Sequence, residues 1–348
     1  MMILVGTEQL QTFVEDALHV VGIPRDDSKI AARCLVRANL RGVEGKGIRQ
    51  LGRAVSMIRA GMISAHPDIR IVGAAESTGL VDADYALGHV AATRAMEIAV
   101  QKAKRSGFSV VSVRHTNDFG MAANYAMLAL ESNCIGMVMT NTTPLVAPWG
   151  GTTRMLGTNP ICISIPARTK APIVFDAATS TVSRSEIELY SESSQSIPST
   201  WAFSISGEPT TNTSSALEGV LTPLGGYKGF GLALVIDLLT GTLSGMASGP
   251  EVRGNSSTYK SSIGQFFASI DLEAFGDPVP FMRKVDELIE DIKTSPLRDG
   301  FQEILLPGEH AHRTEQLRMR TGIPLSTNLW EELTMLAEHL GVEMPHHL

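Results

Sequence analysis

A glycine-rich loop with a single lysine is the segment of this sequence best suited to binding a phosphate. It reads GGYKGFG over residues 225–231 and leads directly into an apolar, helix-like pattern over residues 232–243. Glycines let a backbone approach a ligand closely, and the first turn of a helix offers free N–H groups. Lys228 would add a positive charge at the same point. The pattern fits a phosphate-binding helix N-terminus, but by itself it is a weak signal, because a glycine turn before a helix is often only a turn.

Composition limits the classes of partner that this chain can serve. The chain is 43% hydrophobic and 19% charged, which is typical of a globular protein. Its length of 348 residues predicts two or three interlocked domains. The net charge is −7 and no block of lysine or arginine occurs, so nucleic acids and anionic membranes are poor partners. No apolar stretch approaches the length of a membrane span. We expect a small-molecule substrate.

The cysteines and histidines indicate neither disulfides nor a metal site. Cys34, Cys134 and Cys162 are odd in number and far apart, which is typical of a reducing cytoplasm. We expect all three to be buried small hydrophobes and not catalytic thiols. The nine histidines do not cluster with cysteines or carboxylates at ligand spacing, so we expect no metal. The first six residues lack the basic flank of a signal peptide.

Hydrophobic periodicity and capping signals predict an α/β protein. We expect helices at 7–19, 24–40, 48–60, 86–104, 122–130, 232–243, 279–293, 313–320 and 328–340, and strands at 69–72, 108–113, 135–139, 161–165, 172–175 and 265–270. Residues 183–215 are rich in serine and threonine and are expected to form a mobile loop region. No Gly-x-Gly-x-x-Gly lies between an early strand and a helix, so an ordinary Rossmann domain is not supported.

Eight short motifs occur in a fixed order along nearly the whole chain. They are RGV at 41–43, NxFG at 117–120, the loop at 141–151, LGTNP at 156–160, DAATS at 176–180, IPxxW at 197–201, KGFG at 228–231 and LPGE at 306–309. The set resembles the type-2 malate/L-lactate dehydrogenase family. That family includes ureidoglycolate dehydrogenase, 2,3-diketogulonate reductase and piperideine-2-carboxylate reductase. The resemblance implies an α/β, non-Rossmann dinucleotide fold with interlocked domains, working as a homodimer.

The same resemblance implies a domain division and a cofactor site. Residues 1–120 with 310–348 would form the helical, dimerising and substrate-side domain, and residues 121–309 the dinucleotide-binding-like domain. The cofactor would be NAD or NADP, because no Rossmann acidic residue is present to discriminate between them. Asp176 could instead only cap a turn, and the corner at Gly308 could be only a loop. The residues implied to contact the cofactor are Thr142, Asp176, Ala177, Ala178, Thr179, Ser180, Lys228, Gly308, Glu309 and His310.

The proton-transfer positions depart from the family pattern. The family's first loop carries a Ser-His-Gly whose histidine is taken to protonate the substrate carbonyl, and here Lys46 replaces that histidine. The family's second histidine, in Asn-His-Phe-Gly, is Asp118 here. An aspartate three residues after the motif tryptophan is Ser204 here, and the usual glycine-lysine pair is Ser185-Glu186. The cofactor-like motifs therefore remain, while the acid/base set is rebuilt.

Lys46 and Asp118 are the candidate catalytic pair. Opposite charges within a few ångströms favour both ionised forms, so Asp118 would hold Lys46 protonated. A protonated lysine suits proton donation to a carbonyl or imine better than it suits Schiff-base chemistry, which needs a neutral amine. The alternatives remain open: Lys46 as an exposed loop lysine, Asp118 as a turn residue, and His115 as either a substitute imidazole or a sheet-edge histidine.

We therefore expect an NAD(P)-dependent dehydrogenase or reductase that acts on a small 2-oxo acid or cyclic imino acid. Arg49 or Arg53, near the Lys46 loop, would pair with a substrate carboxylate, and Ser204 would add a polar contact. Both arginines could instead be solvated helix residues. Two other functions are compatible with the sequence. One is a non-redox enzyme, such as an isomerase, a lyase or a Schiff-base enzyme that uses Lys46. The other is a catalytically silent relative that binds a ligand.

Overall fold

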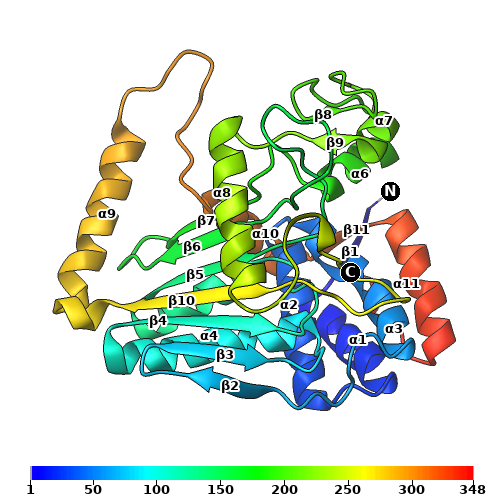
Figure 1. Cartoon of the computed structure of the whole chain (residues 1–348), viewed down its shortest axis with the longest axis horizontal. Helices are drawn as coiled ribbons and strands as arrows, with labels where there is room; N and C mark the ends of the chain where they lie inside the picture. The colour runs from blue at the N-terminus through cyan, green and yellow to red at the C-terminus, as the bar shows by residue number, and fades with distance from the viewer. Residues whose placement is uncertain (1, 348) are drawn as a thin grey trace.

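The computed structural model describes residues 2–347, and its centre is a seven-stranded mixed sheet (Figure 1). The strand order is β2-β3-β4-β10-β5-β6-β7. Only β3 and β4 run parallel among these strands, and the other neighbours are antiparallel. The bounds are β2 (Arg70–Ala74), β3 (Thr78–Asp82), β4 (Phe108–Arg114), β5 (Cys134–Thr140), β6 (Ile161–Ile165), β7 (Ile173–Ala177) and β10 (Gln265–Asp271). The sheet is thus not the parallel sheet of a Rossmann fold.

Helices cover the two faces of the sheet. Along β10, Phe267 lies in one hydrophobic cluster with α4 (Gly88–Ser106), whereas Phe266 and Ala268 lie in another with α8 (Tyr227–Asp237). Successive residues of a strand point to opposite faces, so α4 and α8 pack on opposite sides of the sheet. In Figure 1, α8 stands in front of the sheet and α4 lies behind it. A π-helical turn (Leu238–Thr242) continues α8.

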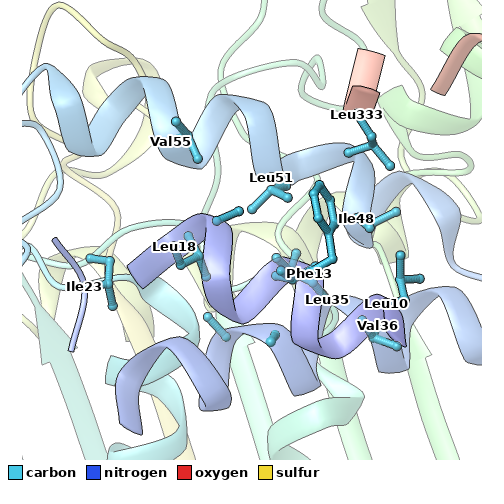
Figure 2. Close-up of a cluster of buried hydrophobic side chains, with 14 of the residues drawn as sticks. Leu10, Phe13, Leu18, Ile23, Leu35, Val36, Ile48, Leu51, Val55 and Leu333 are labelled. Atoms are coloured by element: carbon cyan, nitrogen blue, oxygen red, sulfur yellow. The ribbon is translucent and has the colours of Figure 1, made fainter. Parts of the chain in front are cut away.

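The two ends of the chain share one hydrophobic core. Phe13 of α1 packs among apolar side chains of the segments around α2 and α3, and Leu333 of α11 closes the cluster (Figure 2). Strand β1 (Met2–Val5) pairs antiparallel with β11 (Ile323–Ser326). The helices are α1 (Thr7–Val20), α2 (Arg25–Leu40), α3 (Leu51–Arg59), α10 (Glu309–Thr321) and α11 (Thr327–Leu340). Strand β11 and helix α11 therefore complete a core that the first helices begin.

Residues 183–221 form a small folded lobe, so the prediction of a mobile loop region was wrong. Ser183 and Asn212 cap its two helices, each accepting a backbone N–H with its side chain. Ile187 and Ala202 are buried in a core of their own. Apolar residues spaced among the serines form that core, and the serine- and threonine-rich composition of the segment does not reveal them. The lobe contains α6 (Arg184–Glu192), β8 (Ala202–Phe203), α7 (Thr213–Glu218) and β9 (Val220–Leu221).

The remaining elements agree with the sequence pattern, with local exceptions. The helix expected at 122–130 is a short α5 (Ala123–Ala126) followed by a 3-10 helix (Met127–Ser132). Helix α9 (Pro278–Thr294) lies at the edge of the molecule. The strands β1 and β11 were not predicted, because each is short and acquires its partner from the other end of the chain. Strand β3, which pairs with the neighbouring β2 and with β4, was not predicted either. Among residues 2–347, no helix has both the length and the apolar character needed to cross a membrane.

Candidate active site

The turn that carries Lys46 is held in place from three sides. A Cβ on Gly47 would lie 2.0 Å from Asn39 Oδ1, and that oxygen accepts the N–H of Ile48 at 2.7 Å. A Cβ on Gly45 would lie 2.6 Å from Cβ of Ser185, at the start of α6. The flanking glycines therefore permit close packing at this point. The turn is the 3-10 helix Glu44–Lys46, and its Glu44 pairs with Arg318 at 2.6 Å.

The loop that carries Asp118 is fixed to the start of α4. Asn117 Nδ2 donates to the carbonyl of Ala86 at 2.9 Å. Gly88 lets the loop approach, because a Cβ there would lie 2.2 Å from the carbonyl oxygen of Asn117. The Asp118 carboxylate accepts the N–H of Gly120 at 2.7 Å. These contacts leave the second carboxylate oxygen of Asp118 available to another partner.

The two predicted catalytic residues meet. Lys46 Nζ lies 3.7 Å from Asp118 Oδ2, and the two side chains are 37% and 45% exposed. Desolvation raises the pKa of Asp118. The charge of Lys46 and the hydrogen bond from the Gly120 N–H lower it by more, so the pKa lies below its ordinary value. The aspartate is therefore ionised near neutral pH. An ion pair with this exposure adds little to stability, so its location is more informative than its strength.

A cleft that is partly open to solvent surrounds this pair, and we call it the Lys46 cleft. Apolar side chains, including Ile63 and Leu87, form part of its wall. A small concave site with a few convergent polar groups is the usual form of a site for a small molecule. Its polar lining residues are Lys46, Gln50, Arg53, His89, Asp118 and Asn255.

The start of α8 has the features of an anion site. Gly225 and Gly226 adopt positive φ angles of 59° and 70°, and a Cβ on Gly226 would lie 2.9 Å from the ring of Trp149. Lys228 lies in the first turn, is exposed, and has no ion pair or hydrogen bond within residues 2–347. The unpaired cation and the free N–H groups of a helix N-terminus fit a phosphate. A dinucleotide diphosphate is thus compatible with the residues present.

Hydrogen bonds join three predicted cofactor loops to the turn before α8. Thr142 Oγ1 accepts the N–H of Thr158 at 3.0 Å, and the Thr179 hydroxyl donates to the carbonyl of Thr158 at 3.0 Å. The N–H of Leu224 then donates to the carbonyl of Thr179 at 2.9 Å, and Ser180 forms a β-bridge with Pro223. Thr142, Thr179 and Ser180 therefore belong to the same framework as the Lys228 turn.

Comparison with known proteins decides the family. The family model described as malate/L-lactate dehydrogenase matches residues 5–334. The chain belongs to this family. Malate dehydrogenase of Pyrococcus horikoshii is 40% identical over 349 residues, covering 98% of this chain and 96% of that protein. L-sulfolactate dehydrogenase of Methanocaldococcus jannaschii is 37% identical over 342 residues, covering 98% of each.

The fold agrees with this family assignment. The structure of malate dehydrogenase from Entamoeba histolytica matches with a TM-score of 0.96 at 28% identity, covering 99% of this chain and 100% of that one. The resemblance read from the motifs and the non-Rossmann α/β fold are both confirmed. As a member of the malate/L-lactate dehydrogenase family, the chain is an oxidoreductase. Other relatives carry NAD(+) or NADP(+) in their names.

The remaining predicted cofactor residues lie along or beside β7. Asp176 Oδ2 accepts the N–H of Ala123 at 2.9 Å, and desolvation raises the pKa of this aspartate despite that bond and the charge of Arg41. Ala177 ends β7, and Ala178 follows it. Gly308 packs on Val174, since a Cβ there would lie 2.8 Å from Val174 Cβ, and exposed His310 follows in α10. Glu309 pairs with Lys293 at 2.7 Å.

The structure does not bring Arg49 or Ser204 into the Lys46 cleft. Arg49 binds Glu192 through both Nη atoms, at 2.6 and 3.1 Å, and Ser204 exchanges a hydroxyl hydrogen bond with Ser206 at 2.8 Å. Arg49 lies in the 3-10 helix Ile48–Gln50 before α3, so α-helical spacing does not place it beside Arg53. Arg53 itself lines the cleft and donates to the carbonyl of Asn255. Arg53 is the arginine available to a substrate.

The sequence interpretation missed His89. This residue, the second of α4, lines the Lys46 cleft and is 7% exposed. No motif or spacing near His89 in the sequence predicts this role, because His89 lines the cleft only where the distant Asp118 loop packs against the start of α4. His115 does not take the role of substitute imidazole, since its Nδ1 lies 3.0 Å from Asp82 and its ring packs on Tyr85. His115 lies directly after β4, an interior strand of the sheet, so it is at the end of a strand and not on an edge strand as the alternative interpretation had it.

The cysteines contribute no nucleophile to the site. All three are unpaired and buried, as expected from the sequence. Burial raises the pKa of the Cys34 thiol to about 11, and it also raises the pKa of Cys134 and of Cys162. Each thiol is therefore protonated at neutral pH, and a protonated thiol is a poor nucleophile.

Proposed function

We propose that this chain reduces a small 2-oxo acid or cyclic imino acid with NADH or NADPH. The observation that carries the proposal is the pairing of Lys46 Nζ with Asp118 Oδ2 at 3.7 Å inside the Lys46 cleft. Relatives named for malate and for sulfolactate support a 2-hydroxy acid and 2-oxo acid couple. The oxidoreductase family favours this redox function over a non-redox enzyme or a silent relative.

Lys46 would supply the proton of the reaction. A bound nicotinamide supplies the hydride, so the protein has to orient the substrate and manage one proton. The Asp118 carboxylate lies 3.7 Å from the Lys46 amino group, from which a proton would pass to the carbonyl oxygen or imine nitrogen. Arg53, which lines the same cleft, would pair with the substrate carboxylate in place of Arg49. One cleft thus contains both a proton donor and a carboxylate anchor.

The dinucleotide would bind with its diphosphate at the start of α8. Lys228 and the free N–H groups of that turn supply the charge complementarity. Thr142 and the segment 176–180 would continue the site, because hydrogen bonds connect them to the same turn. The segment 308–310 beside β7 is proposed as its outer edge. NAD and NADP both remain candidates.

The test combines cofactor binding with turnover. The variants are Lys46→Ala, Asp118→Asn, their double variant and Lys228→Ala, assayed with NADH and NADPH against oxaloacetate, sulfopyruvate and piperideine-2-carboxylate. The two cleft variants should lose turnover but keep cofactor binding, and their losses should be non-additive because the residues act as a unit. Lys228→Ala should weaken cofactor binding.

Two results would remove the proposal. The first is a protein that changes the fluorescence of neither NADH nor NADPH. The second is a pair of Lys46 and Asp118 variants with full turnover.

We further propose a homodimer of cytoplasmic location, with residues 1–120 plus 310–348 as the dimerising, substrate-side domain and 121–309 as the dinucleotide-binding domain. The shared core of the chain ends supports the grouping of 310–348 with the first helices. The sheet, however, takes strands from both sides of residue 120, so the two domains interlock. The exposed apolar side chains of α8 and of the π-helical turn after it, among them Val235 and Leu238, support association.

A further inference from the structure

The imidazole of His89 is a buried polar group without a partner. The residue is 7% exposed, and neither ring nitrogen has a hydrogen-bond partner within residues 2–347. Buried polar atoms are almost always hydrogen-bonded, and each one left unpaired costs about 1–3 kcal/mol. A histidine that served only to fill the core would bond a carbonyl or hydroxyl with at least one nitrogen. An orphaned ring on the wall of a cleft therefore indicates a partner that enters the cleft.

Three charged groups from three segments face the same cleft as His89. Lys46 comes from the 3-10 helix before Gly47, Arg53 from α3, and Asp118 from the loop after β4. Gly120 is the direct neighbour of the ring, since a Cβ there would lie 3.2 Å from His89 Nε2 and 3.2 Å from the carbonyl oxygen of Lys46. The imidazole, the Lys46 backbone and the Asp118 loop thus converge on one point.

Burial keeps this imidazole neutral. Desolvation lowers the pKa of His89 to about 4, and the opposing effect of Asp118 is partly cancelled by Lys46. A neutral imidazole has one N–H donor and one acceptor nitrogen, and it gives up its N–H proton very reluctantly. Such a ring can stabilise negative charge on an oxygen by hydrogen bonding without taking part in the proton transfer.

We propose that His89 is a third catalytic residue, whose imidazole N–H donates a hydrogen bond to the reacting oxygen of the substrate while Lys46 delivers the proton to that oxygen. The inference rests on the proposed function. A bound nicotinamide would supply the hydride for the new C–H bond, and the π pair of the C=O bond would move to the oxygen. That oxygen takes a proton from the Lys46 ammonium and becomes a hydroxyl. His89 stabilises the developing negative charge and leaves the reaction unchanged.

The arrangement divides two tasks between two groups. A carbonyl oxygen has two lone pairs and can accept from both Lys46 and His89. The donor that must be charged lies beside Asp118, whereas the donor that must stay neutral lies in the desolvated wall at the start of α4. The positive end of the α4 dipole also opposes protonation of the ring at that position.

The first experiment compares His89→Leu and His89→Gln with His115→Gln. Leucine removes both ring nitrogens, glutamine keeps an N–H donor, and His115 is a control because it binds Asp82 outside the cleft. The measurements are kcat and KM for a 2-oxo acid, NADH binding, and the melting temperature. We expect kcat of His89→Leu to fall about 100- to 1,000-fold, with a smaller fall for His89→Gln. NADH binding and His115→Gln should be unaffected.

The second experiment observes the ring directly, so a poorly folding variant does not decide the result. Nitrogen-15 NMR of the histidine-labelled wild-type protein should show the His89 N–H resonance shift when oxamate is added to the NADH complex. Oxamate is an unreactive analogue of a 2-oxo acid and presents a carbonyl oxygen to the site. The His115 resonances should remain in place.

The outcomes separate the inference from the proposed function. Wild-type turnover together with full activity in both His89 variants, or with no His89 shift on adding oxamate, would overturn the role of His89 and leave the reductase intact. A wild-type protein without NADH or NADPH binding would remove both. Parallel loss of melting temperature and turnover in His89→Leu, with normal kcat in His89→Gln and no shift, would assign the ring a structural role only.

Discussion

Two titratable residues of one cleft are driven in opposite directions by their surroundings. Asp118 is held ionised by the charge of Lys46 and the N–H of Gly120, although desolvation opposes this. His89 is held neutral because desolvation dominates, and its pKa falls to about 4. Sites where the pKa values of neighbouring groups diverge are where acid, base and hydrogen-bonding tasks are usually assigned. At the residue scale, this divergence supports the roles proposed for the cleft.

Folding stability should depend on pH through His89. The folded protein binds a proton on this ring less tightly than the unfolded chain does, whose ordinary value is 6.5. The contribution of the neutral His89 ring to the free energy of unfolding is therefore fully present above pH 6.5. It is lost as the pH falls toward 4, and the loss amounts to about 3 kcal/mol. Urea unfolding of wild type and His89→Gln between pH 7 and 4.5 should show the steeper loss in wild type. Equal pH slopes would contradict the assignment.

The start of α4 positions two of the cleft residues at once. Gly88 opens the helix, His89 follows it, and the loop that carries Asp118 rests on the space where a Gly88 side chain would be. A small change in this one turn therefore moves both the imidazole and the carboxylate. At the element scale, the geometry of the cleft depends on how closely a helix start and a loop can approach.

Gly88→Ala should damage both stability and turnover. The added Cβ would lie 2.2 Å from the Asn117 carbonyl oxygen and 2.3 Å from that of Asp118, so backbone has to move. Overpacking of this kind costs about 1–3 kcal/mol. The matched control is Gly52→Ala in α3, where nothing lies within 4 Å and stability should stay level or rise by up to about 1 kcal/mol. Urea unfolding midpoints and turnover should be measured for both variants. Equal midpoints for Gly88→Ala and Gly52→Ala would refute the close approach of the Asp118 loop to Gly88.

At the scale of the whole molecule, the two ends of the chain pair and pack against each other. Strand β11 pairs with β1, and α11 packs on the helices of the first sixty residues (Figure 2). The Lys46 turn also depends on this closure, because Arg318 of α10 anchors Glu44. Loss of packing at the C-terminal end should therefore lower the free energy of unfolding of the whole protein.

Leu333→Ala should reveal this closure in unfolding experiments. Leu333 is 3% exposed within the shared core, and removing its side chain should cost about 2–5 kcal/mol. Met335, two residues along the same helix, is 63% exposed, so Met335→Ala should change stability by less than about 0.5 kcal/mol. Chemical denaturation of both variants provides the comparison. Similar midpoints for the two would mean that α11 is not part of the main core.

The outer face of α8 should mediate dimer formation. The helix is mostly apolar, yet Val235 of α8 and Leu238 of the π-helical turn after it are about half exposed in one chain. Light scattering of the wild type should give twice the mass of one chain at micromolar concentration. A Leu238→Glu variant should give the single-chain mass, and Met335→Glu on α11 should not. A monomeric wild type would remove the homodimer proposal.

Sequence alone determined the elements whose signals are local. The strand over 161–165, the strand that became β10 and the helix after Pro24 were all predicted within a residue or so, because periodicity and caps act over neighbouring residues. Ordered motifs also identified the family, and they predicted the pairing of Lys46 with Asp118. That pairing was predicted from the loop geometry that the resemblance implies for the two motifs.

Tertiary structure alone decided the features that depend on distant contacts. His89 enters the cleft only because Gly88 and Gly120 let the Asp118 loop pack on α4, and no local spacing encodes that approach. Arg49 turns to Glu192 because the chain before α3 is a 3-10 helix, which leaves Arg53 in the cleft. Strands β1 and β11 exist only as partners from opposite ends of the chain. Local propensity fixes where elements lie in the sequence, whereas long-range packing selects which side chains meet.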